Sequence, residues 1–69
     1  MSRIKRQLRY NIFPEEDVFV ARCLEVEVAS DGHTEAAAVA NLREALAVYF
    51  DEPASSFSLA LEQDVHRGD

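Results

Sequence analysis

The sequence holds a single cysteine, Cys23, among its 69 residues. A disulfide within the chain is therefore excluded, and a thiol with apolar neighbours fits a reducing compartment. A chain of this length buries only about 60% of the surface that its unfolded form exposes. Small domains without disulfides or metals usually gain the missing stability from oligomerisation. We therefore expect a homo-oligomer, either a dimer or a tetramer.

Metal-binding and nucleophilic side chains are also scarce. His33, His66 and Cys23 do not have the spacing of a known metal site, so we expect no metal and no cofactor. Cys23 would need a nearby base or a positive field to become a nucleophile. Its position among apolar strand residues predicts an inert, packed thiol, so we expect no catalytic residue there.

Long hydrophobic runs are absent from the sequence. The most apolar stretch, residues 36–50, is interrupted by Asn41, Arg43 and Glu44. It is also shorter than the roughly 20 residues that a membrane span requires, and no segment resembles a signal peptide. We therefore expect a soluble, cytoplasmic protein without membrane contact.

Acidic residues are missing from the first nine positions, where Arg3, Lys5, Arg6 and Arg9 give a charge of +4. The whole chain carries −6, so the remaining residues carry −10. This acidic body disfavours a phosphate backbone and favours a basic partner. The basic segment is a weaker candidate for nucleic-acid contact, because such runs are more often the solvated face of a strand.

Apolar and polar residues alternate in a way that predicts three strands, over residues 4–13, 18–23 and 26–29. The connection between the first two strands is short and predicts an antiparallel hairpin. In the third strand Glu25 and Glu27 would lie on the face opposite the valines. Alternation alone explains this pair as a solvent face, so we do not interpret it as a catalytic carboxylate pair.

The stretch after these strands has the features of a turn followed by a helix. Ser30 and Gly32 are expected to end the sheet, with glycine supplying a positive φ in the turn. Thr34 is the best N-cap candidate for a helix over residues 35–51. Asn41 either donates a hydrogen bond to the preceding loop or is a plain exposed amide.

One face of this helix is apolar and is expected to pack on the sheet; it consists of Ala38, Val39, Leu42, Ala45, Leu46 and Tyr49. Pro53 ends the helix, and residues 57–62 alternate as a short fourth strand. The predicted fold class is α+β in the order β-β-β-α-β, an antiparallel three- to four-stranded sheet with one helix on one face. Residues 1–63 form one domain, and residues 64–69 a frayed tail.

Two surfaces are candidates for partner contact. Val18 and Val20 lie on the sheet face that a single helix cannot cover, so they are the candidate oligomer interface. Glu15, Glu16 and Asp17 form an acidic turn after Pro14. Such a turn is usually only solvated, but within an acidic body it is also a candidate contact for a basic partner.

The pattern Ser30-x-Gly32-x-Thr34, followed by Asn41-Leu42-x-Glu44-Ala45, resembles the HicB-type antitoxin family, over about residues 8–52. The resemblance implies a degenerate ribonuclease H-like fold without catalysis. It also implies a partner, a small basic RNA-cleaving toxin of the HicA type that the antitoxin masks.

The chain departs from the family pattern at several points. Ala37 stands where the family usually has a glutamate that completes a capping box with Thr34. The turn after the first strand lacks the family's glycine, and no C-terminal DNA-binding domain is expected.

We therefore expect a non-catalytic antitoxin of a type II toxin-antitoxin system. The first alternative is a stand-alone HicB-like interaction or regulatory module without a toxin. The second is a nucleic-acid binder that uses the basic N-terminal strand.

Overall fold

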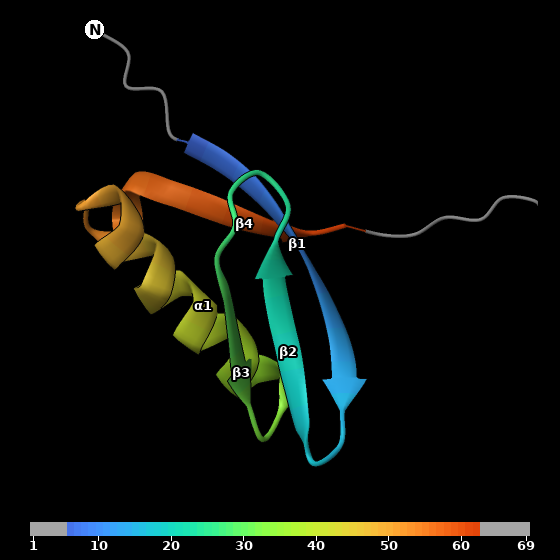
Figure 1. The fold of residues 1–69 in the computed structure, drawn as a ribbon. Coiled ribbons are helices and arrows are strands. Elements are labelled where there is room, and N and C mark those ends of the chain that lie inside the picture. The colour runs from blue at the N-terminus through green and yellow to red at the C-terminus, as the bar shows by residue number, and fades with distance from the viewer. Residues whose placement is uncertain (1–5, 63–69) are drawn as a thin grey trace, which may run out of the picture.

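The computed structural model describes residues 6–62. Arg3 and Lys5 of the basic segment and the predicted tail lie outside that range. The chain forms an α+β fold in the predicted order (Figure 1). Its elements are β1 (Arg6–Glu15), β2 (Val18–Cys23), β3 (Ala29–Gly32), α1 (Glu35–Phe50), a 3-10 helix (Ala54–Ser56) and β4 (Phe57–Leu61).

The sheet is mixed, with strand order β3-β2-β1-β4. The hairpin of β1 and β2 is antiparallel as predicted, and β3 continues the antiparallel pattern beside β2. The prediction of an antiparallel sheet is wrong for the last pair, because β4 runs parallel to β1. Helix α1 returns the chain to the end of the sheet where β1 begins, and such a crossover is what joins strands of the same direction.

The third strand lies three residues later than predicted, at Ala29–Gly32. Residues 24–27 instead form a bend, anchored where the amide of Leu24 donates to the carbonyl of Arg9 at 2.9 Å. The carboxylate of Glu25 also accepts from the amide of Arg9 at 2.9 Å. Glu25 and Glu27 are therefore not neighbours on one strand face, because a long-range contact to β1 replaces the strand that local alternation predicts.

Ser30 and Gly32 lie within β3, and Gly32 does not adopt a positive φ, so the prediction of a turn at these two residues is wrong. A Cβ atom at this position would lie 2.6 Å from the amide nitrogen of Ala38 and 2.7 Å from the carbonyl carbon of Ala37. Both contacts are with backbone atoms, which cannot rotate away. Glycine is therefore required here because β3 passes directly against the first turn of α1.

The helix begins and is anchored as predicted. The hydroxyl of Thr34 accepts from the amide of Ala37 at 3.0 Å, which satisfies one of the free first-turn amides. Asn41 donates from Nδ2 to the carbonyl of Asp31 at 2.8 Å, which is the first of the two predicted alternatives. Asp51 ends the helix in the left-handed region with φ 58°, and its amide donates to the carbonyl of Val48.

The core lies between α1 and the sheet. Its buried members are small or aliphatic except for one aromatic ring: Leu8, Ala21, Cys23, Ala38, Leu42, Leu46 and Phe57. Tyr49, predicted on the packed face, is 57% exposed. The packed row advances by four residues along the helix and reaches Phe50, whose ring lies 6.0 Å from that of Phe57. The row therefore drifts around the helix and leaves Tyr49 outside.

Candidate interaction surfaces

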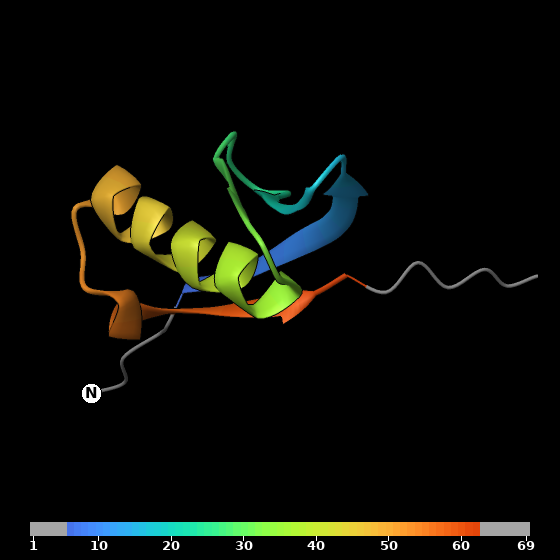
Figure 2. The ribbon, with the colours of Figure 1, turned by 90° about the horizontal axis from the view of Figure 1, so that it is seen from below.

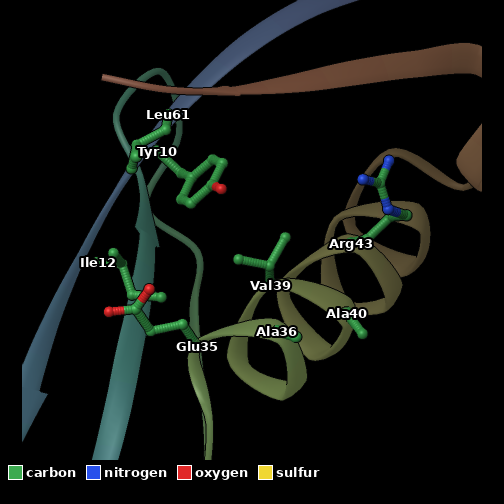
Figure 3. A pocket seen from close by; sticks show the side chains of 8 residues that line it. All are labelled: Tyr10, Ile12, Glu35, Ala36, Val39, Ala40, Arg43 and Leu61. Atoms are coloured by element: carbon green, nitrogen blue, oxygen red, sulfur yellow. The ribbon is translucent and has the colours of Figure 1, made fainter. Parts of the chain in front are cut away.

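Helix α1 lies on one side of the sheet and packs against β2 and β3 (Figure 2). On the same side a groove of about 470 Å³ lies between the helix and the ends of β1 and β4. Figure 3 shows the side chains of Tyr10 and Leu61 on the sheet side and Val39 on the helix side. Leu61 is 47% exposed, so the groove leaves apolar surface without cover.

The opposite sheet face carries the predicted interface residues Val18 and Val20, both of which are half-buried. The register places Phe13 of β1 opposite Val20 and Glu15 opposite Val18. Phe13 is 37% exposed and enlarges the apolar surface that the two valines form. Sequence reasoning missed Phe13. In the alternating first strand the odd-numbered residues lie on the face opposite Tyr10 and Ile12, which places Phe13 on the side of the two valines.

Glu15, Glu16 and Asp17 lie at the tip of the hairpin and are all exposed. Glu16 adopts φ 57°, a conformation that residues with a Cβ atom rarely take. The ion pairs found among residues 6–62 use Arg6 and Arg9 and do not include these three acids. We call the three acids together with Phe13, Val18 and Val20 the hairpin surface.

The basic residues at the start of β1 are engaged within the chain. Arg9 donates from Nε to Glu25 at 2.9 Å and from Nη1 to Glu62 at 3.3 Å. Arg6 donates to Glu52 at 2.9 Å, and its guanidinium lies 4.2 Å from the ring centre of Phe50. A phosphate would have to compete with these contacts, and nucleic-acid binding by this strand stays a prediction.

These ion pairs shift the ionisation of their members. The backbone amide of Arg9 and then its guanidinium lower the pKa of Glu25 below the ordinary value of 4.5. Arg6, followed by the Ser56 hydroxyl, lowers the pKa of Glu52. Contact with Glu25, and to a lesser degree Glu62, raises the pKa of Arg9. The Arg9–Glu25 pair therefore acts as a charged clip between β1 and the bend after β2.

The remaining candidate residues do not converge on one site. Cys23 is buried in the core, as predicted for a packed thiol, and His33 is exposed beside the helix start. Over residues 6–62, no group of three or more histidine, cysteine, aspartate or glutamate side chains is placed to hold a metal ion. Within the same range, no helix has the length and apolar character needed to cross a membrane.

Comparison of the chain with protein-family models, curated proteins and solved structures gives no match. Functional interpretation then depends on three surfaces of the structure: the hairpin surface, the groove beside α1 and the outer edge of β4.

Proposed function

We propose that this chain is a non-catalytic, HicB-like antitoxin that binds and masks a small basic ribonuclease of the HicA type. The hairpin surface is the observation that supports this most. It places three exposed carboxylates at the hairpin tip, next to the apolar side chains of Phe13, Val18 and Val20. An apolar centre with a charged rim is the usual anatomy of a protein–protein interface.

Charge complementarity strengthens the case for a basic partner. The chain carries a net charge of −6, and its basic residues Arg6 and Arg9 already pair with its own carboxylates. The carboxylates of the hairpin tip add to an acidic field that accelerates association with a cationic surface.

The resemblance to HicB-type proteins gains support from how the motif residues are used. Gly32, Thr34 and Asn41 together fix β3 to the beginning of α1, through close packing, a helix cap and a hydrogen bond. In this proposal the motif builds the junction of the scaffold, and the hairpin surface supplies the candidate contact.

The first test is whether a small basic ribonuclease is encoded in the neighbouring reading frame. That protein, purified and mixed with this chain, should bind it and lose its RNA-cleaving activity. If the ribonuclease neither binds nor is inhibited, the proposal is wrong.

A charge-neutral triple variant, Glu15→Gln with Glu16→Gln and Asp17→Asn, tests the surface. We expect its association rate at low salt to fall by about tenfold or more, with a weaker salt dependence. The matched control changes three exposed acids elsewhere: Glu27→Gln, Glu44→Gln and Asp51→Asn. Equal effects of the two triple variants would show that only net charge matters and would remove the hairpin surface from the proposal.

A further inference from the structure

The two edges of the sheet differ in how well they are protected. The β3 edge is four residues long, contains Ser30 and Asp31, and lies against α1. Among residues 6–62, β4 forms the other edge, and its sequence, Phe57–Leu61, has no charged residue and no proline. Natural edge strands are usually blocked by charge, proline, a bulge or a covering element, because an open edge pairs with other chains.

The hydrogen bonds of β4 show which backbone groups are available on its outer side. The amide of Glu62 donates to the carbonyl of Tyr10 at 2.8 Å, so residue 62 faces β1. In a parallel ladder alternate residues direct both backbone groups to the same neighbour. Ser58 and Ala60 therefore also face β1, while Phe57, Leu59 and Leu61 direct N–H and C=O outward.

This outward set is self-complementary. In an antiparallel pair centred on Leu59, each Leu59 lies opposite the other, and Phe57 of each copy lies opposite Leu61 of the second copy. Every outward residue then exchanges two hydrogen bonds with its opposite, about six in total. A two-fold axis between the two Leu59 residues relates the strands, so the outward backbone groups of both copies are hydrogen-bonded in the same way, as an isologous interface requires.

We propose that β4 pairs antiparallel with β4 of a second copy in this register, joining two four-stranded sheets into one. The side chains of Phe57, Leu59 and Leu61 all lie on the α1 side of the sheet, so the apolar row continues from one copy to the next. The pairing places the exposed Leu61 beside the strand position of Phe57 in the second copy, whose ring stays in its own core. Both helices then lie on the same side of the joined sheet.

Pairing of β4 with a second copy does not depend on a toxin partner. β4 pairs with the first half of β1, whereas the hairpin surface lies at the far end of that strand. Strand pairing alone buries less area than a standard interface, so we expect a dissociation constant in the micromolar range.

Disulfide cross-linking tests the register. Ser58 and Ala60 are exposed and would lie opposite one another across the axis as a non-hydrogen-bonded pair, with Cα atoms about 4.5 Å apart. The double variant Ser58→Cys with Ala60→Cys should give, on mild oxidation, a covalent dimer of twice the 7.8 kDa chain mass. Each single cysteine variant, and the wild type with its buried Cys23, should give little or none.

A second measurement uses the outward amide of Leu61. Leu61→Pro removes that amide while leaving the ladder to β1 intact, and should raise the dimer dissociation constant by about tenfold or more. Leu61→Ala keeps the amide and is the matched control, with a smaller expected effect. Light scattering at about 100 µM and circular dichroism report mass and folding.

A wild type that is monomeric at this concentration would overturn the proposal. A dimer that persists in Leu61→Pro without cross-linking of the double cysteine variant would also overturn it, and would point to another surface. If Leu61→Pro fails to fold, the cross-link decides. Neither outcome bears on binding of a basic ribonuclease, which is measured separately.

Discussion

Two regions on the α1 side of the sheet are covered to very different extents. In the covered region Ala21 and Cys23 of β2 lie beneath the helix, and Gly32 brings the backbone of β3 against its first turn. In the open region, Tyr10 and Leu61 line a groove that the helix does not fill. Small residues allow the helix to lie very close to β2 and β3. Because the helix lies over these two strands, the ends of β1 and β4 are left without cover.

The largest expected contrast comes from shortening one leucine in each region. Leu42→Ala removes a fully buried side chain and should lower the free energy of unfolding by about 2–5 kcal/mol. Leu61→Ala removes a half-exposed one and should cost less than about 1 kcal/mol. Urea unfolding of the two variants, at a protein concentration well below the dissociation constant expected for the β4 pair, measures the contrast in the single chain. Equal losses at this concentration would mean that Leu61 is covered within its own chain.

Gly32→Ala tests the close approach that distinguishes the covered region. The added methyl group would overlap backbone atoms of Ala37 and Ala38, so we expect a loss of about 2–3 kcal/mol. Ala29→Ser, at an exposed position of the same strand, is the control and should change stability by less than about 0.5 kcal/mol. A neutral or stabilising Gly32→Ala would refute the steric explanation for this glycine.

Asn41→Ala tests the polar link between helix and strand in the covered region. The variant leaves the carbonyl of Asp31 without this donor, and we expect a loss of about 1 kcal/mol. Thermal unfolding measures this loss of stability, and Glu44→Ala, at a nearby exposed helix position, is the control. A loss no larger than that of the control would mean that water replaces the amide without cost.

The smallest expected effect concerns the Arg9–Glu25 clip, which joins β1 to the bend after β2. Because folding lowers the pKa of Glu25, its stabilisation is present above about pH 4.5 and is lost as pH falls through the lower, folded-state value. Glu25→Gln should therefore show a shallower loss of stability than the wild type as pH falls from about 5 to 3. Glu44→Gln should follow the wild-type curve, and parallel curves for Glu25→Gln would contradict the clip.

Most elements of the fold follow from local pattern, and those elements were predicted. The strands predicted over residues 4–13 and 18–23 and the cap by Thr34 each depend on residues close in sequence, although the first strand runs on through Pro14 to Glu15. The hydrogen bond from Asn41 was one of two predicted alternatives. The direction of β4 could not be predicted, because alternation of apolar residues is the same in parallel and antiparallel strands.

The error in the third strand has a different physical cause, which is contact between residues distant in sequence. Glu25 reaches Arg9 and turns a predicted strand into a bend. Arg6, an apparent misfit on the apolar side of β1, is accommodated by the ring of Phe50 and the carboxylate of Glu52. Of the hairpin surface, the three acids were predicted as a contact for a basic partner and the two valines as an oligomer interface, and both roles stay predictions. Phe13 could have been found from its position in the alternation.

The parallel pairing of β1 with β4 also has a consequence for how the chain folds during synthesis. Arg6 pairs with Phe57, roughly fifty positions later, whereas the hairpin and the capped helix form from neighbours in sequence. On the ribosome these local pieces can form early, but Leu8 gains its packing against the last strand only after Leu61 has emerged. Until then β1 exposes a free edge, so the nascent chain is most prone to wrong pairing in the interval before its final strand arrives.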